Sequence, residues 1–462
     1  MDDPLALVVE ASAIHADRAP EYLMYRDYRD GRHRMDFASD GFRKSFGWAL
    51  LQAQENLMPA IVSAHTNLLS IEAWTASESD AQDATDAGLQ RLAELVHAES
   101  HTTGNAFTIT WNRPGVTEPM AIFHRADQVI PFVNEEQPDV LDAAVKLWID
   151  RDGFGRGAVY DAGHLYRFAT KSKMAYQVRR NDGTTAAPAY PDDRHAWQAY
   201  DAEGAPAVEA HSFGVVPVVW WKRDAISQFD PGRSVLVDAI PVQDELNKLI
   251  ADAVVAGERI ARPVRYVMDV AEELLKPRLV NGKLQPPTLP FDDTNTLLAM
   301  TAKGPAGQFP GPDATSIIAL QQHAEQKLSR TTGIPSWLLN PTGGNVPSGT
   351  ALRIMLTQLV SQAKSFQRDA TPSWKGQLEL LGMSNPAIKW ADPMPSSDEE
   401  RLANAAEAKA LGLPAEEWLR IGGWDPAARD ESGVSLVDRV AAAQQAKVQD
   451  AVGALYAGNV GL

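Results

Sequence analysis

The chain has 462 residues, of which 44% are hydrophobic, and it carries a net charge of −17 and no cysteine. The length corresponds to about three domains at roughly 150 residues each, and the hydrophobic fraction is sufficient for folded cores. The lack of cysteine excludes a disulfide framework and thiolate chemistry, which fits a protein made and kept in the cytoplasm. The negative charge favours solubility and repels nucleic acid and acidic membranes, so that any DNA contact is expected to be local and weak.

The first hundred residues are expected to be mainly helical, with a turn at Asp30-Gly31. From Phe42 to Leu69 apolar residues recur at helical spacing, which predicts an amphipathic helix with a kink at Pro59. A shorter helix is expected from Asp83 to His97. The N-terminus lacks the basic start of a secretory signal. The densest apolar run, Gly214–Trp221, is far below the roughly 18 residues that a membrane span needs, so no membrane partner is expected.

From Ala106 the pattern changes to that of strands. Phe107, Ile109 and Trp111 alternate with threonine, and β-type residues recur at 158–160, 165–169 and 175–180. Residues 181–183 and 201–204 have the composition of hairpin turns. These signals predict an α+β region that ends near Trp221.

A long helix is predicted after this region. Asp238 is a candidate N-cap, and Pro241 falls in the first turn, where proline is tolerated. An apolar stripe then runs from Val242 to Ile260, and the helix is expected to end at Arg262-Pro263. It is acidic near its start and basic at its end, as the helix dipole favours.

A second helix is predicted from Asp313 to Thr332-Gly333, after a short segment of mixed pattern, Pro263–Pro310. This segment has strand-like ends at 264–268 and 296–300, a small helix at 270–275 and an Asn-Gly turn at 281–282. The order of elements predicts an antiparallel helix pair with a small α/β insert at one end.

The uncharged run from Thr331 to Leu352 is the least ordinary stretch of the chain. It is rich in glycine and proline, and a connection this long between helices is usually functional or disordered. The following helix has its apolar stripe from Leu352 to Phe366, with Ile354 and Val360 off the stripe, so it should be buried on several sides or packed against another subunit. The tail is expected to be helical at 398–411, 414–421 and 436–456, with no fixed-period repeat.

Several motifs resemble chemical sites without completing one. His97 and His101 lie four apart, but Glu99 is one position late for the zinc-protease pattern, so solvated surface histidines are expected. Gly153–Gly157 is a fragment of a dinucleotide loop, interpreted as a turn between strands, and Gly304–Gly311 lacks the lysine of a phosphate-binding loop. The acidic clusters, 192–193 and 398–400, are expected to be solvated faces and caps. No catalytic residue, metal site or cofactor is predicted, and the protein is not expected to be an enzyme.

A group of basic residues lies where the first long helix enters the insert. One interpretation is charge complementarity at the helix end together with ordinary surface. The alternative is contact with phosphates or with an acidic partner. The group comprises Arg259, Arg262, Arg265, Lys276, Arg278 and Lys283.

The order of elements and several short stretches resemble the portal protein of tailed double-stranded-DNA bacteriophages, with the closest likeness to the Gp6-like portal family. Each motif alone is weak, but together they cover most of the chain to about Phe366. The stretches are Tyr28–Arg34, His211–Val219, Ile240–Lys248, Thr332–Pro335 and Pro347–Leu352.

The resemblance implies an α+β, mainly helical fold with portal architecture. Residues 1–235 would form an α/β wing, 236–262 and 312–333 a two-helix stem, and 263–311 a small α/β clip. A tunnel loop at 334–349, a long kinked helix at 350–382 and a helical C-terminal region at 383–462 would follow. The family forms a homo-oligomeric ring, generally of twelve subunits, at one capsid vertex of the virion, assembled in the host cytoplasm. It works with scaffold and major capsid protein, the terminase large subunit that packages the genome, and head-completion or adaptor proteins, and the genome is later ejected through it.

In this interpretation the loop faces double-stranded DNA in transit, with weak and non-specific contact. A basic side chain there would add a salt-dependent phosphate contact to every step, so the lack of charge is expected to keep DNA moving. Glycine would let the loop change shape as the duplex passes. The candidate DNA-facing residues are Asn340, Thr342, Gly343, Gly344, Asn345, Val346, Pro347 and Ser348.

Three other functions are compatible with parts of the pattern. Another head–tail connector or adaptor ring protein would usually be shorter and lack paired stem helices. A metal-dependent hydrolase would use His97 and His101 and would copurify with metal. A monomeric helical scaffold would form no pore.

Overall fold

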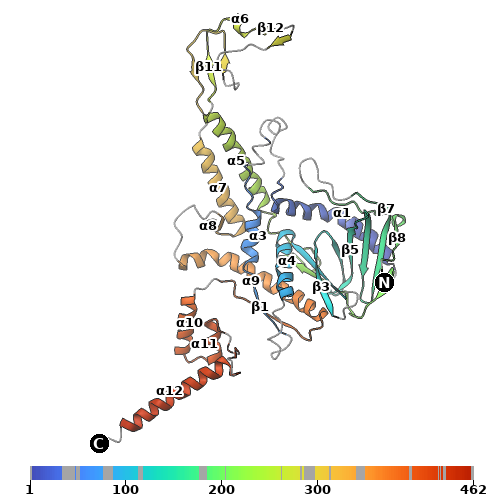
Figure 1. The fold of residues 1–462 in the computed structure, drawn as a ribbon, viewed down its shortest axis with the longest axis vertical. Coiled ribbons are helices and arrows are strands. Elements are labelled where there is room, and N and C mark those ends of the chain that lie inside the picture. Colours follow the sequence, from blue (N-terminus) through green and yellow to red (C-terminus); the bar gives the residue numbers. More distant parts are fainter. Residues whose placement is uncertain are drawn as a thin grey trace. The chain divides into compact units, whose positions relative to one another are not determined.

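The structure is a computed structural model. It describes residues 3–33, 47, 53–75, 87–112, 118–175, 185–202, 204–261, 263–280, 283–285, 297–311, 314–339, 349–394, 398–424, 426, 428–429 and 433–458. The fold mixes α and β structure, as expected, and divides into two compact units, Met1–Pro393 and Met394–Leu462 (Figure 1). Within the described ranges, no helix combines the length and apolarity needed to cross a membrane.

Helix α1 (Pro4–Arg29) starts with the Asp3 side chain accepting a hydrogen bond from the Ala6 amide, and it ends at the turn expected around Gly31, which has a φ of 76°. Helix α3 (Met58–Thr66) differs from expectation. The described residues 54–57 are not helical, and Pro59 lies in the first turn of α3 instead of kinking a longer helix. The physical reason is that proline lacks an N–H and is best tolerated where that N–H has no helical partner.

Two antiparallel sheets face each other across a shared apolar core. The smaller has the order β10–β2–β3, and the larger has the order β4–β5–β6–β7–β8, with β9 also paired to β7. Helix α1 packs on the larger sheet through Val8 and Ala11. The strands are β2 (Asn105–Asn112), β3 (Pro119–Arg125), β4 (Val129–Val133), β5 (Leu141–Ile149), β6 (Phe154–Tyr160), β7 (His164–Lys173), β8 (Trp197–Ala199), β9 (Val208–Ala210) and β10 (Val218–Lys222), with a short 3-10 helix η1 (Arg194–Ala196) before β8.

Two turn predictions in this region need correction. Residues 201–204 do not join a hairpin, because β8 and β9 both pair with β7 instead of with each other. The 153–157 segment is a turn only at its start, and Gly155 and Gly157 lie inside β6. A Cβ on Gly157 would lie 3.0 Å from Val8 of α1, so a larger residue there would press on the helix. The expected turn at 181–183 lies outside the described residues.

A tryptophan cluster joins the smaller sheet to two helices, α4 (Ala87–Thr103) and α9 (Gly349–Leu380). The ring of Trp374 in α9 lies 4.4 Å from Trp74 and 4.5 Å from Trp221, measured between centroids. Strands β1 (Ile71–Thr75) and β16 (Ala387–Trp390) pair beside this cluster. Residues 383–393 therefore belong to the first compact unit, and none of them is helical.

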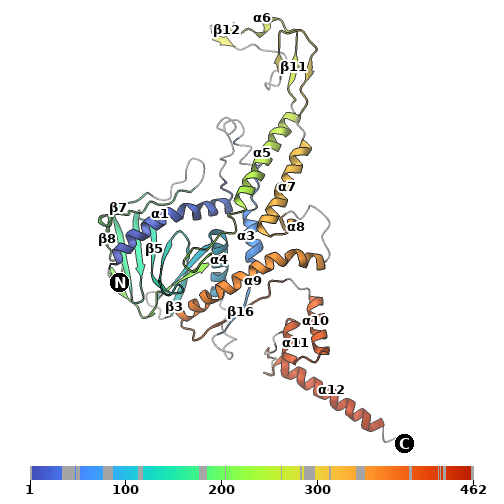
Figure 2. The ribbon, with the colours of Figure 1, turned by 180° about the vertical axis from the view of Figure 1, so that it is seen from behind.

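The predicted helix pair and its insert are confirmed as secondary structure. Helices α5 (Ile240–Ala261) and α7 (Ala314–Thr332) lie side by side, and the insert lies beyond their ends (Figures 1 and 2). Asp238, expected to cap α5, instead forms an ion pair with Arg233. The insert contains β11 (Arg265–Val267), α6 (Glu272–Leu275), β12 (Arg278–Val280), β13 (Lys283–Gln285), β14 (Leu297–Ala299) and β15 (Gly307–Gln308).

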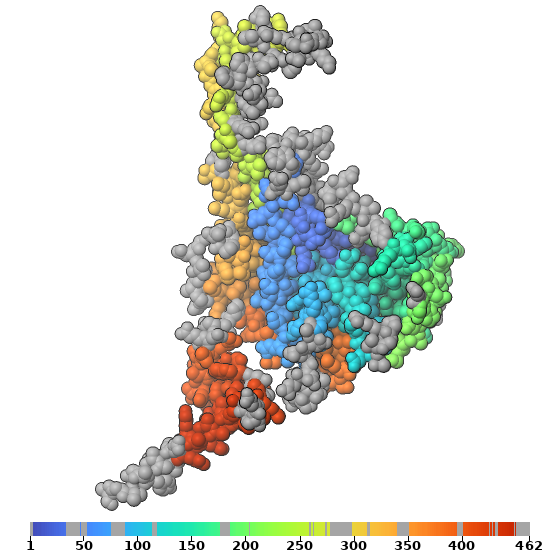
Figure 3. Space-filling model, in the orientation of Figure 1, coloured from blue at the N-terminus to red at the C-terminus, as the bar shows by residue number. Residues whose placement is uncertain are grey.

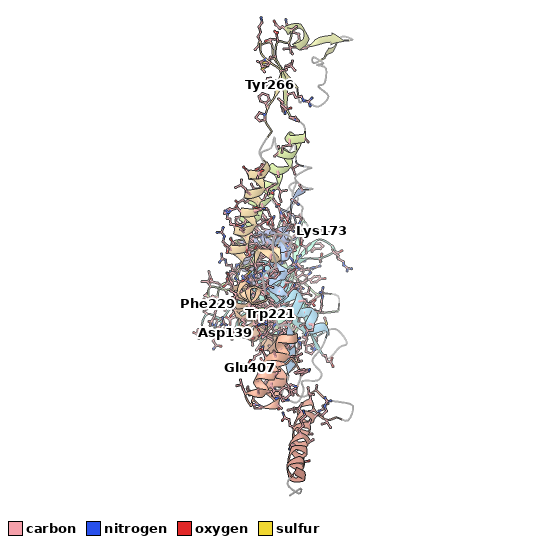
Figure 4. The ribbon with its side chains drawn as sticks, turned by 90° about the vertical axis from the view of Figure 1, so that its left-hand side faces the viewer. Asp139, Lys173, Trp221, Phe229, Tyr266 and Glu407 are labelled. Carbon is pink, nitrogen blue, oxygen red and sulfur yellow. The ribbon has the colours of Figure 1, made fainter. Side chains whose placement is uncertain are left out.

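The insert has a small aromatic centre. Tyr266 of β11 (Figure 4) lies 5.1 Å from Phe309 between ring centroids, and its hydroxyl would lie 2.7 Å from a Cβ on Gly307. Gly304 is similarly close to Met268. These glycines therefore serve close packing inside the insert.

The second compact unit contains the three helices expected in the tail. They are α10 (Asp398–Ala410), α11 (Ala415–Ile421) and α12 (Leu436–Gly458). Trp418 and Leu419 of α11 are buried against Ala408 of α10. The first turn of α12 contributes Val437 and Val440 to this core, whereas residues 441–447 are exposed.

Candidate functional site

The α5–α7 pair is joined by apolar and charged contacts between the first half of α5 and the second half of α7. Leu246 of α5 and Leu328 of α7 are buried in one core, and Ala324 lies in the same core. The Lys327 ammonium lies 2.7 Å from the Glu245 carboxylate across the pair. These contacts make the two helices one structural element.

Buried amides attach the start of α5 to the N-terminal segment. The Gln243 side chain accepts a hydrogen bond from the Leu57 amide at 3.0 Å and donates to the Glu55 carbonyl at 2.8 Å. The Asn247 amide lies 2.7 Å from Nδ1 of His33. Because buried polar groups are costly to leave unpaired, these contacts fix the register of α5 against the body.

The exit of α7 is held in one conformation. Gly333 has a φ of 74°, and a Cβ there would lie 2.9 Å from the side chain of Gln358 in α9, so glycine is required. The Ser329 hydroxyl donates to the carbonyl of the buried Ile334 at 2.6 Å. The predicted loop is shorter than expected, because residues 336–339 form the helical turn α8 (Ser336–Leu339) and α9 begins at Gly349.

The predicted tunnel-loop residues fall between Leu339 and Gly349. Asn340, Thr342, Gly343, Gly344, Asn345, Val346, Pro347 and Ser348 lie outside the described residues. What the structure describes is their frame, the end of α7 with α8 on one side and the start of α9 on the other.

Helix α9 is anchored through its second half. Gln377, fully buried, accepts from the Thr108 hydroxyl at 2.5 Å and donates to the Thr110 hydroxyl at 2.9 Å. The Trp374 indole donates to Nε2 of His97 at 3.2 Å. Near its start, Ile354 is 71% exposed, so within one chain this part of the helix is not buried on several sides, and packing against another subunit stays a prediction.

The structure separates the predicted basic residues. Arg265 begins β11, whereas Arg278 and Lys283 lie in the separate β12–β13 hairpin. The Lys276 ammonium lies 3.1 Å from Glu272 in an exposed ion pair, so its charge is partly satisfied within the chain. Arg262 and the side chains of Arg259, Arg278 and Lys283 lie outside what is described.

Exposed apolar side chains follow the helix pair toward the insert. Ile318 and Leu320 of α7 are 51% and 54% exposed, and on the face shown in Figure 3 the surface of α7 is open. Ile260 of α5 and Phe309 of the insert are exposed to a similar extent. These residues are exposed apolar surface of the helix pair and the insert.

His97 and His101 are not surface residues, which corrects the expectation. Both are 2% exposed, at the contact of α4 with α9. The Nδ1–H of His101 donates to the His97 carbonyl at 2.7 Å, and Phe366 packs on both rings. Burial lowers the pKa of His97 to about 3. The four-residue spacing predicts that both side chains share one helix face, but it carries no signal that α9 covers that face. Among the described residues no group of three metal-ligating side chains occurs.

Of the predicted acidic caps, the one at Asp193 is confirmed. The Asp193 carboxylate accepts a hydrogen bond from the His195 amide at 2.9 Å. Asp398 is the first residue of α10.

Comparison with known proteins gives one family match. Residues 82–420 match the family described as phage portal protein, SPP1 Gp6-like. This range includes α5, the insert, α7 and α9. A search of curated proteins finds no match.

Solved structures with a similar fold include parts of gene transfer agent (GTA) particles. The neck of a native GTA particle, computed with C12 symmetry, is 14% identical with a TM-score of 0.38, covering 80% of this chain and 89% of that one. The neck of an empty GTA particle, computed with C6 symmetry, is 12% identical with a TM-score of 0.42, covering 81% and 91%. The virion of a native particle is 14% identical with a TM-score of 0.41, covering 82% and 94%.

Proposed function

Because this chain belongs to the SPP1 Gp6-like family of phage portal proteins, we propose that copies of it assemble into the ring that forms the DNA channel at one capsid vertex. The family match carries this proposal, since it extends over the helix pair, the insert and all of α9. In the proposed role, the ring is the passage for packaging and ejection and the docking site for head-completion proteins. It acts as a connector and not as an enzyme.

The elements take specific positions in the proposed ring. Residues 1–235 form the wing, 236–262 and 312–333 the stem, 263–311 the clip, 334–349 the tunnel loop and 350–382 the helix behind it. The C-terminal unit, with the preceding residues from 383, is assigned to crown or wing. Twelve subunits are proposed. The exposed apolar residues of α5, α7 and the start of α9 support this arrangement, because a neighbouring subunit would cover them.

The partners follow from the same role. Terminase and later an adaptor protein would dock at the clip end, where Arg265 and the exposed Lys276 are candidate contacts. Scaffold and major capsid protein would contact the ring during assembly of the virion in the host cytoplasm. Exposed charged residues of this kind mainly affect the rate and salt dependence of docking.

The ring can be tested by negative-stain microscopy of concentrated protein, alone and coexpressed with its scaffold. Closed rings with a central hole are expected. Compact monomers under both conditions would contradict the proposal. Mass measurement of the rings would give the subunit number, and a value other than twelve would correct the stoichiometry without removing the ring.

Replacing Asn345 with lysine should slow DNA packaging while leaving ring assembly intact. Each lysine would add a phosphate contact that must be broken at every step, and these contacts weaken with salt. Packaging rates should therefore recover as the salt concentration rises. Asn345→Gln is the matched control, since it is polar and uncharged. Equal packaging rates for the lysine and glutamine variants would count against contact between this loop and DNA.

A further inference from the structure

The loop between β10 and α5, residues 224–231, presents apolar side chains to solvent. Ile226 is 92% exposed, more than any other large hydrophobic residue in the part of the chain that the structure describes, and Phe229 is 49% exposed. Between Asp224 and Asp230 the sequence AISQF carries no charge. The loop therefore has an uncharged apolar tip flanked by two carboxylates.

The base of this loop is fixed by close backbone contacts. The Arg233 amide donates to the Arg223 carbonyl at 2.7 Å, and the Arg223 amide donates to the Gly104 carbonyl at 3.0 Å. A Cβ on Gly104 would lie 2.1 Å from the carbonyl oxygen of Gly232. The two backbone segments therefore approach each other more closely than residues with a Cβ allow. The Gly232 amide donates to the Asn105 side chain at 2.9 Å.

The tip is ordered by its own hydrogen bonds. The Ser227 hydroxyl donates to Asp230 at 2.7 Å and accepts from the Phe229 amide at 3.3 Å. The Lys222 ammonium donates to the Gln228 carbonyl and lies 4.2 Å from the centre of the Trp220 ring. A loop held in this way loses little freedom on binding, which favours its use as a contact.

The surface beside the loop extends the patch. Asp139 and Asp230 both interact with the Lys222 ammonium, and Figure 4 shows Asp139 and Phe229 at the same margin of the molecule. Val140, next to Asp139 in the sequence, is 46% exposed. Asp139 and Val140 lie in the turn before β5. We call the uncharged apolar tip of the loop, residues 226–229, the 226–229 knob.

We infer that the 226–229 knob inserts into the neighbouring copy of this chain when the ring forms. This inference rests on the proposed ring. A stable independent interface buries about 1,200–2,000 Å², whereas one aromatic side chain buries only about 150–250 Å². The knob is therefore too small to hold a separate partner by itself. It suits a neighbouring copy that other contacts in the ring already hold.

The charge of the chain favours the same occupant. Each copy carries a net charge of −17, so neighbouring copies repel one another. An uncharged apolar tip can enter an acidic neighbour without adding to that repulsion. In a closed ring each copy contacts its two neighbours through different faces, so one knob per copy is sufficient for every interface.

The double variant Ile226→Ser, Phe229→Ser tests the knob. We expect the protein concentration at half-maximal ring assembly, measured by light scattering after size-exclusion chromatography, to rise at least tenfold. Thermal unfolding of the monomer should change little, because Ile226 and Phe229 are exposed. Val208→Ser in β9 is the control, since Val208 is 51% exposed but lies away from the knob in sequence and sheet, and it should assemble as wild type.

Crosslinking identifies the occupant. The chain has no cysteine, so Ile226→Cys provides a single attachment point for a photoreactive maleimide. In assembled rings the label should join two copies at one mapped site. Crosslinks confined to one chain, or unchanged assembly of the double variant, would overturn the inferred insertion of the knob while leaving the proposed ring intact. A double variant that assembles normally but loses scaffold binding would overturn it in favour of a scaffold contact. Wild-type protein that never forms rings would overturn both proposals.

Discussion

Replacing Arg26 with methionine is expected to lower the free energy of unfolding by about 3–5 kcal/mol, because the change strands two buried carboxylates. Arg26 of α1 donates to Glu99 of α4 and, at 2.6 Å, to Asp127 in the turn between β3 and β4. The Glu99 and Asp127 side chains are 7% and 4% exposed. One guanidinium therefore joins three elements that are far apart in the sequence.

The pKa of Asp127 shows how much depends on this contact. Burial raises the pKa of Asp127, but the charges of Arg26 and Arg125 outweigh burial and hold the pKa below its usual value. Without Arg26, the Asp127 carboxylate would keep an ion pair only with the partly exposed Arg125, whose guanidinium lies 3.2 Å away. The pKa of Asp127 should then rise, and part of the lost stability should return at acidic pH.

Urea unfolding followed by tryptophan fluorescence would measure the effect of Arg26→Met. The matched control is Arg91→Met, which removes an exposed ion pair with Glu94 and should cost no more than about 1 kcal/mol. Arg26→Lys should fall between the two, because a single ammonium cannot bridge two carboxylates as a guanidinium does. Equal midpoints for Arg26→Met and Arg91→Met would show that the buried network contributes little.

Local patterns predicted most of the helices and the position of the insert. The stripe that begins at Val242 and the turn at Thr332-Gly333 locate α5 and the end of α7 within a few residues. Such signals are reliable because amphipathic spacing and glycine at positive φ depend on neighbouring residues alone. The same reasoning placed the three tail helices.

Features that depend on distant residues were not predictable in this way. Strands β1 and β16 pair across more than three hundred positions, and each is too short to show a clear alternation. The burial of His97 depends on α9, and Gly157 of β6 lies against Val8 of α1. For the candidate site, the sequence located the frame of the predicted loop but missed α8, a single turn that shows no periodicity.

Acidification is expected to destabilise the first compact unit between about pH 6.5 and pH 3, through three buried histidines. His65 of α3 and His97 and His101 of α4 are each less than 5% exposed, and the rings of His65 and His101 lie 6.0 Å apart. Burial lowers the pKa of all three, to about 3 for His97, and the charge of Arg223 lowers the pKa of His65 and His101 further.

The direction of the pH effect follows from these pKa values. In the unfolded chain a histidine has a pKa of about 6.5, so below that pH the unfolded state binds protons that the folded state excludes. The stabilisation is complete above pH 6.5 and is lost as the pH falls. For His97, with a pKa of about 3, the loss by pH 5.5 is on the order of 1 kcal/mol, since one pH unit corresponds to about 1.4 kcal/mol per group. His65 and His101 act in the same direction.

The variant His97→Gln isolates one of these protons. Glutamine can still accept the hydrogen bond from the Trp374 indole, so packing against α9 is largely retained. Between pH 6 and 4, the unfolding free energy of this variant should depend less steeply on pH, by an amount that corresponds to about one bound proton. The control His195→Gln, at an exposed position, should leave the slope unchanged. A slope in His97→Gln equal to that of wild type would exclude His97 as an acid-sensitive group.

Because α9 leads from the predicted loop into this cluster, protonation should loosen α9 from α4 first, and hydrogen exchange in α9 should rise before that of the larger sheet.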